Sequence, residues 1–136
     1  MITTKPKFGL IASVVSLAVV LLTAGCGSKP VDAPFEEQLR EQLELAENGA
    51  LITIPAGTFE FDRSLSLKAD GITLRGQGMD QSILSFKNQI AGAEGLTVTG
   101  DDFVIEDLAI EDTIGDALKI NEGTNIVIRR VRTEWT

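Results

Sequence analysis

Short apolar segments recur in the second half of the chain at a spacing of about 22 residues. The segment FVI at 103–105 is followed 23 residues later by IVI at 126–128, and LTV at 96–98 is followed 22 residues later by LKI at 118–120. A regular period of this length is typical of repeat proteins, in which each repeat packs against its neighbours. The spacing therefore restricts the chain to a solenoid.

From Leu51 onward, Gly, Asp and Asn residues separate short segments in which apolar and polar residues alternate. There are eleven such segments, at 51–54, 58–61, 65–67, 72–74, 84–86, 96–98, 103–105, 108–110, 118–120, 126–128 and 131–133. Because three fall in each period, the pattern predicts an all-β parallel β-helix of about 3.7 rungs over residues 50–136. A β-sandwich or jelly roll is the alternative, but it explains neither the spacing nor the brevity of the strands.

The earlier copies of the repeat can be aligned on their apolar pairs. We align Ile52/Ile54 with Ile72/Leu74, Phe59/Phe61 with Leu84/Phe86, and Leu65/Leu67 with Leu96/Val98, with a longer loop at 87–95. In this arrangement the apolar side chains point inward and stack on their counterparts one rung away, about 4.8 Å apart. Each contributes roughly 1.5 to 3 kcal/mol on full burial, which makes a credible core for a narrow solenoid.

Residues 35–49 follow a helical period instead. Four apolar residues form one stripe on this helix: Phe35, Leu39, Leu43 and Ala46. Pro34 stands at its entry, and Asn48-Gly49 supplies a left-handed stop. Because the first rung of a solenoid leaves strand edges and an apolar opening uncovered, we expect this helix to cap that end through Phe35, Leu39 and Leu43.

The first 25 residues have the features of a bacterial export signal. Lys5 and Lys7 precede an uncharged, mostly apolar run at 8–23 that ends in small residues. A permanent transmembrane anchor is the alternative, but the run is shorter than the roughly 20 residues that span a bilayer. We therefore expect residues 1–25 to be a signal peptide.

The segment LTAGC at 22–26 resembles the lipobox of bacterial lipoproteins, although Thr23 departs from the aliphatic residue usual at its position. The resemblance implies that Cys26 is acylated and becomes the first residue of the mature chain, with residues 26–34 as a tether and the membrane as a partner. Gly27 follows the cysteine where lipoproteins retained at the inner membrane carry Asp. The resemblance therefore implies a lipid-anchored protein of the cell envelope, at the outer membrane in a diderm organism.

Charge and composition exclude several kinds of site. The 12 basic and 20 acidic residues give a formal charge of −8, which argues against nucleic acid as a partner. The chain has no His and a single Cys, so it lacks the residues for a Ser-His-Asp triad, a His-ligated zinc site or an internal disulfide. Almost no soft ligand for copper remains once Cys26 is acylated. No cofactor is expected, with calcium as the one alternative.

Three segments carry a further resemblance: ALITIPAGTFEF at 50–61, GITLRGQGMDQSILSF at 71–86 and NIVIRRVRTEW at 125–135. After the predicted cap helix, they resemble the first coils of right-handed parallel β-helix proteins of the pectin-lyase-like superfamily, and above all bacterial parallel β-helix repeat lipoproteins. Members of this group bind uronate-containing polysaccharides or act on them as lyases, hydrolases or epimerases. Others are periplasmic accessory proteins, including copper-delivery factors of nitrous oxide reductase.

The resemblance implies an exported, membrane-anchored lipoprotein whose β-helix binds or processes acidic, uronate-type polysaccharide. The alternative is a noncatalytic structural or periplasmic accessory protein. Whether the chain is an enzyme stays open, because none of the lyase, hydrolase or epimerase motifs is present and no catalytic residue can be transferred. Trp135, the single tryptophan, could stack on a sugar ring or fill the terminal rung.

Acidic residues gather between positions 106 and 116. Glu111, Asp112 and Asp116 are weak candidates for a calcium site, because calcium accepts several carboxylates at flexible spacing. The 23-residue register favours a different arrangement, in which Arg129 lies beside Glu106 and Arg130 beside Asp107, with Arg75 also against Glu106. We therefore expect a solvated ladder of salt bridges along adjacent strands.

The chain stops at Trp135-Thr136, within the second strand of the predicted fourth rung. Ending there leaves the inward residues Ile126, Ile128 and Val131 on an open strand edge, where solenoids have a polar terminal repeat. We therefore expect the sequence to be the N-terminal portion of a longer β-helix.

Overall fold

The structure is a computed structural model that describes residues 33–136. The predicted export signal at 1–25, the lipidation site Cys26 and most of the tether at 26–34 lie outside the described residues. From residue 33 onward, no helix is both long and apolar enough to cross a membrane.

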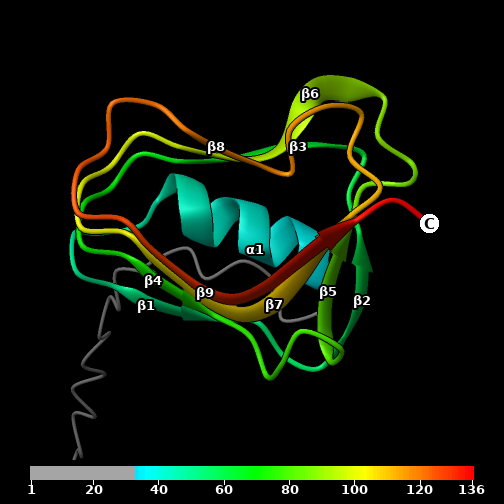
Figure 1. Ribbon diagram of the computed structural model, residues 1–136, viewed down its shortest axis with the longest axis horizontal. Helices are drawn as coiled ribbons and strands as arrows, with labels where there is room; N and C mark the ends of the chain where they lie inside the picture. The colour runs from blue at the N-terminus through cyan, green and yellow to red at the C-terminus, as the bar shows by residue number, and fades with distance from the viewer. Residues whose placement is uncertain (1–32) are drawn as a thin grey trace, which may run out of the picture.

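The described residues form one helix and nine strands. In chain order these are α1 (Phe35–Glu44), β1 (Leu51–Thr53), β2 (Gly57–Glu60), β3 (Arg63–Leu67), β4 (Thr73–Arg75), β5 (Ser82–Ser85), β6 (Ala91–Val98), β7 (Val104–Glu111), β8 (Leu118–Ile120) and β9 (Val127–Glu134). The strands wind into a β-solenoid of about three turns, and Figure 1 looks along it.

Every strand pair in the solenoid is parallel and joins equivalent strands of successive turns. One sheet holds β1, β4, β7, β5 and β2, with β9 paired to β7, and the other holds β3, β6 and β8. A β-sandwich or jelly roll would require antiparallel neighbours. The prediction of a parallel solenoid is therefore confirmed, and the sandwich alternative is wrong.

The structure has fewer and longer strands than the eleven expected. The segments at 103–105 and 108–110 belong to one strand, β7, and those at 126–128 and 131–133 belong to β9. Asp107 and Arg130, at φ values of 59° and 51°, make each bend with a single residue. Since no loop intervenes, β7 and β9 pair in the same register on both sides of the bend.

The predicted register is confirmed for most of the repeat and wrong at its start. Phe59 pairs with Leu84, Leu65 with Leu96, Leu96 with Leu118, and Ile105 with Ile128, as expected. Ile52, however, pairs with Leu74 and not with Ile72, which is two residues away. The error arises because the last two apolar residues of the four-residue segment at 51–54 were aligned with the two ends of the three-residue segment at 72–74.

The inward side chains of both sheets and of α1 form one apolar core. Seventeen buried residues make up this cluster, which runs from Leu39 to Ile110 and includes the three largest, Phe61, Phe86 and Phe103. Phe61 and Phe86 are neighbours on successive turns, and their rings stack with centroids 5.4 Å apart. Stacking of like residues along the axis therefore holds consecutive turns together.

Helix α1 crosses the area enclosed by the strands in Figure 1 and packs against β2 and β3. Leu39 and Leu43 are buried in the core, and the Phe35 ring lies 4.3 Å from that of Phe59. The predicted contacts of the cap are thus present. The helix ends at Glu44, earlier than the Asn48-Gly49 stop, and Gly49 instead forms a turn at φ 83°.

The expected loop at 87–95 is only partly a loop. Strand β6 already begins at Ala91, which pairs with Arg63, while Leu65 pairs with Leu96. The intervening residues of β6 bulge outward, and the Gln89 amide nitrogen donates to the Glu94 carbonyl across this bulge at 2.9 Å. A buried amide therefore supports the irregular segment.

Candidate functional site

The outer face of β1, β4, β7 and β9 carries two rows of side chains that run along the solenoid. Backbone alternation turns every second residue of these strands outward, and the register aligns them from turn to turn. The charged row consists of Arg75, Glu106 and Arg129, with uncharged Thr53 in register on β1. The apolar row consists of Leu51, Val104 and Val127, with polar Thr73 in register on β4. This face is the candidate site.

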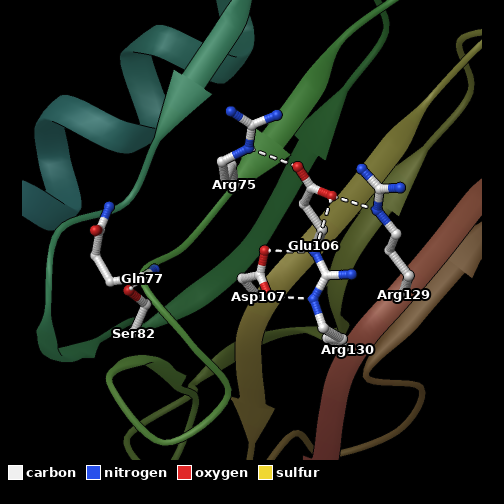
Figure 2. A network of polar contacts seen from close by, with 7 residues as sticks. All are labelled: Arg75, Gln77, Ser82, Glu106, Asp107, Arg129 and Arg130. Carbon is white, nitrogen blue, oxygen red and sulfur yellow. Dashed lines mark hydrogen bonds and ion pairs between the residues drawn. The ribbon is translucent and has the colours of Figure 1, made fainter.

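Glu106 lies at the centre of the charged row, between two arginines (Figure 2). Its Oε1 accepts a 2.5 Å hydrogen bond from Nε of Arg75, and its Oε2 accepts one from Nε of Arg129. The pairs predicted from the 23-residue register are therefore confirmed. The expectation of a fully solvated ladder is wrong at Glu106, whose side chain is only 2% exposed because the arginines of both neighbouring strands cover it.

The two arginines remain accessible. The side chain of Arg75 is 47% exposed and that of Arg129 is 53% exposed. Each guanidinium contacts Glu106 through Nε, and Figure 2 shows the Nη atoms of both residues pointing away from the carboxylate. The outward edges of both guanidinium groups therefore face solvent.

Asp107 and Arg130 form a second pair at the bend of β7 and β9. Nε of Arg130 donates to Oδ1 of Asp107 at 2.5 Å, and one of its Nη atoms donates to Oδ2 at 2.8 Å. Both oxygens of the carboxylate are thus occupied, and Arg130 also lies within 3.4 Å of Glu106. This guanidinium is more fully engaged than those of Arg75 and Arg129.

These contacts stabilise the charged forms of the side chains. Hydrogen bonds from Arg129 and then from Arg75 hold the pKa of Glu106 below its ordinary value, against the opposing effect of burial. The hydrogen bonds with Asp107 raise the pKa of Arg130, and those from Arg130 lower the pKa of Asp107. The charged forms of Glu106, Asp107 and Arg130 are therefore favoured.

The turn after β4 fixes the position of Arg75. The backbone N–H of Gly76 donates to the backbone carbonyl of Glu106 at 3.0 Å. The backbone N–H of Gln77 donates to the buried hydroxyl of Ser82 at 2.8 Å; Figure 2 shows both of these residues. The Ser82 hydroxyl in turn donates to the carbonyl of Pro55 at 2.9 Å. The buried hydroxyl of Ser82 thus links the connection between β4 and β5 to the connection between β1 and β2, one coil of the solenoid earlier.

Two of the three weak calcium candidates have other partners, and the third is exposed. Glu111 pairs with Arg132 at 2.7 Å, and the Asp112 carboxylate accepts hydrogen bonds from the backbone and hydroxyl of Thr136. Asp116 is exposed, and its charge contributes to the raised pKa of Lys119, behind the larger effect of the hydrogen bond with Glu94. Within residues 33–136, no group of three or more acidic or other ligating side chains is arranged to hold a metal ion.

Trp135 lies away from the charged row. Its indole N–H donates to the carbonyl of Thr113 at 2.8 Å, and the side chain is 66% exposed. It borders a hollow lined by inward residues of the last strands, among them Ile120, Ile128 and Val131.

The apolar row was not recognised in the sequence. Leu51 is 57% exposed and Val127 is 40% exposed, although both stand next to inward apolar residues. The signal is the apolar residue two positions before the charged one in VIE and VIR. The same position holds Leu51 in LIT and Thr73 in TLR, a relationship that becomes visible once Leu51 is aligned with Thr73. The misplaced register of the first copy concealed it.

Comparison of the chain with protein-family models, curated proteins and solved structures finds no match.

Proposed function

We propose that this chain is an exported lipoprotein, anchored through acylated Cys26, whose right-handed β-helix binds acidic polysaccharide on the outer face of β1, β4, β7 and β9. The lipobox-like segment at 22–26 and the likeness of residues 50–61 and 71–86 to pectin-lyase-like proteins support the anchor and the handedness. The proposal concerns binding, and it assigns no catalytic residue.

The observation that carries the proposal is the pairing of a charged row with an apolar row on one exposed face. Arg75 and Arg129 present guanidinium edges that suit planar carboxylates. Leu51 and Val127 present apolar surface beside them, which suits the C–H faces of sugar rings. A polymer of sugars that carry carboxylates offers both kinds of group along one line.

The local charge of this face differs from that of the whole chain. The formal charge is −8, yet the exposed residues along the charged row are neutral Thr53 and two arginines, since Glu106 is buried between them. An anionic polymer would therefore meet cations at this face. Its binding should weaken with salt, because exposed charge contacts are screened.

Isothermal titration of the purified full chain tests the binding proposal. We would titrate polygalacturonate and hyaluronate, with neutral dextran as the negative control, at low and physiological salt, with calcium or with chelator. At least one acidic polymer should bind and dextran should not. The size of the recovered polymer would separate binding from cleavage.

Two variants connect binding to this face. Arg75→Gln combined with Arg129→Gln should weaken binding at least about tenfold, whereas Arg63→Gln, an exposed arginine on β3, should leave it unchanged. Because the double variant leaves Glu106 without its two cations, Val127→Glu provides a second test that alters only an exposed residue. Failure of every acidic polymer to bind, or equal binding by all variants, would overturn the proposal.

The lipid anchor is tested separately. Metabolic labelling with a fatty acid should mark the wild-type protein and place it in the membrane fraction. The Cys26→Ala variant should incorporate no label. Labelling of the variant to the same extent would exclude acylation at Cys26.

A further inference from the structure

Asn48 and Gly49 form the only Asn-Gly dipeptide in the sequence, and they lie between α1 and β1. Asparagine is a thermolabile residue. It is lost when the backbone nitrogen of the next residue attacks the side-chain carbonyl carbon, and glycine permits the closest approach because it has no Cβ. This dipeptide is therefore the position in the sequence where spontaneous deamidation is chemically most favoured.

The reaction would proceed through a cyclic succinimide. The Gly49 backbone nitrogen loses its proton and bonds to Cγ of Asn48, the bond from Cγ to the amide nitrogen breaks, and ammonia leaves. Water then adds to one of the ring carbonyls and opens the ring. The product is aspartate or isoaspartate, and in isoaspartate the main chain runs through Cβ and Cγ and is longer by one atom.

In the folded chain a single residue, Asp70, holds both reacting groups. The backbone N–H of Gly49 donates to the backbone carbonyl of Asp70 at 2.8 Å. The backbone N–H of Asp70 donates to Oδ1 of Asn48 at 3.0 Å. The attacking nitrogen therefore has its proton engaged in a hydrogen bond, and the side-chain carbonyl is held against the next coil of the solenoid.

These two hydrogen bonds protect a site that packing does not shield. Asn48 and Gly49 are both exposed. Within residues 33–136, apart from the chain neighbours of Gly49, no heavy atom lies within 4 Å of the position that a Cβ on Gly49 would occupy. Water reaches the dipeptide, so its reaction depends on opening of the contacts with Asp70.

The same contacts recur at the next corner, where they enclose Asp70-Gly71. Oδ1 of Asp70 accepts from the backbone N–H of Asp101 at 2.9 Å, and the backbone N–H of Gly71 donates to the carbonyl of Asp101 at 2.8 Å. An Asp-Gly dipeptide also forms a succinimide, with loss of water. Each corner therefore holds the reactive dipeptide of the coil before it.

The first corner is the less restrained of the two. In the described part of the chain β1 pairs with one strand, β4, whereas β4 pairs with β1 and β7. Beyond β1 lies α1, which is held to the core by Leu39 and Leu43. Since the end of a solenoid has a neighbour on one side only, local opening should begin there.

We propose that Asn48-Gly49 is a site of spontaneous modification whose rate is controlled by local opening of the α1 end of the solenoid, and that Asp70 keeps it unreactive while that end is closed. The isoaspartate product lengthens the main chain between α1 and β1, which displaces the Gly49 N–H from the Asp70 carbonyl. Modification therefore makes a transient opening of the cap permanent. This inference is independent of the proposed polysaccharide binding.

Peptide mapping by mass spectrometry tests the proposal on the full chain. The folded protein, the same protein in urea and an unstructured peptide with the sequence of residues 44–53 are kept in the same mildly alkaline buffer. Asn48 in the folded protein should react at least about tenfold more slowly than in the other two samples. Asn48→Ser should show no mass change in this peptide. A rate in the folded protein equal to or above that of the peptide would overturn the proposal.

Two matched variants separate opening of the cap from global unfolding. Leu39→Ala loosens α1 and should speed the reaction at Asn48 several-fold, whereas Leu108→Ala removes an equally buried leucine from β7 and should change the rate much less. Because either loss could prevent folding, Phe35→Ala is a milder change to the cap, where the Phe35 ring packs on Phe59. Faster reaction in the cap variants alone supports the proposal, and equal acceleration by Leu108→Ala overturns control by the cap.

Discussion

The Oδ1 atom of Asp70 accepts a 2.9 Å hydrogen bond from the backbone N–H of Asp101, the residue in the corresponding turn of the next coil. The same contact occurs before and after it. Asn48 accepts from the N–H of Asp70 at 3.0 Å, and Asp101 accepts from the N–H of Thr124 at 2.7 Å. A column of side-chain acceptors therefore joins the coils at the corner that precedes the first strand of each.

Asp101→Ala should destabilise the fold, because it removes the acceptor for both the backbone N–H and the hydroxyl of Thr124. Urea unfolding followed by circular dichroism should show a lower midpoint with a similar slope. Asp80→Ala, which removes an exposed aspartate from the turn after β4, should change the midpoint less. Equal midpoints for Asp101→Ala and wild type would contradict the role of this column.

Leu74→Ala should cost about 2 to 5 kcal/mol of unfolding free energy, because Leu74 is fully buried between Ile52 and Ile105 on the neighbouring coils. Leu51→Ala changes the same residue type on an exposed position and should stay within about 0.5 kcal/mol of wild type. Chemical denaturation of the two variants measures both values. Similar losses for both would mean that Leu74 does not face the core.

Gly76→Ala should destabilise the turn after β4 by bringing a methyl group against β7. A Cβ at this position would lie 2.2 Å from the carbonyl oxygen of Asp107 and 2.8 Å from Cβ of Ser82. Gly115→Ala is the milder comparison, since its nearest atom, the carbonyl oxygen of Ala93, lies at 3.2 Å. Thermal unfolding should place the melting temperature of Gly76→Ala clearly below that of Gly115→Ala, and the opposite order would contradict the close approach.

Stability should fall as pH is lowered from about 5, the region where unfolded carboxylates begin to bind protons. Hydrogen bonds from Arg129 and Arg75 lower the pKa of Glu106, and those from Thr124 lower the pKa of Asp101, in the folded state. The unfolded chain therefore binds more protons, and stability is lost as pH falls through the folded pKa values.

Glu106→Gln should reduce the slope of the unfolding free energy against pH, by the contribution of up to about one bound proton. Urea midpoints measured between pH 3 and 7 would test it. Glu122→Gln removes an equal charge from an exposed position and is the control. An equally steep pH dependence in Glu106→Gln and wild type would show that Glu106 does not contribute.

The local features of the repeat could be predicted where two copies have equal lengths. Each paired residue of β7 lies opposite the residue of β9 that is 23 positions later. The pairing of Glu106 with Arg129 could therefore be deduced by counting. Between the first two copies the connections differ, since residues 54–56 join β1 to β2 whereas residues 76–81 join β4 to β5. These unequal connections change the offset from 22 at Ile52 and Leu74 to 25 at Phe59 and Leu84, so no single offset aligns the first two copies, and matching the apolar ends of their first segments placed Ile52 against Ile72 instead.

Other features depend on conformation that no local pattern shows. Arg130 adopts a positive φ at the bend of β9, although arginine rarely favours that region. The burial of Glu106 results from arginines on two different strands closing over it, which the spacing alone does not measure. The two rows likewise appear only when the register of every strand is known.

The bulge in β6 allows coils of different length to share one cross-section. Leu65 and Leu96 are 31 residues apart in the chain, whereas Leu96 and Leu118 are 22 apart, yet each pair stacks in register. Three of the additional residues lie in the bulge between Ala91 and Leu96, where the offset between the paired strands rises from 28 to 31, and the others lie in the connections before β5 and before β6, so the core is not displaced. Insertions at this corner can therefore accumulate during divergence without a change of fold, so related chains can differ in length here while the rows on the opposite sheet keep their alignment.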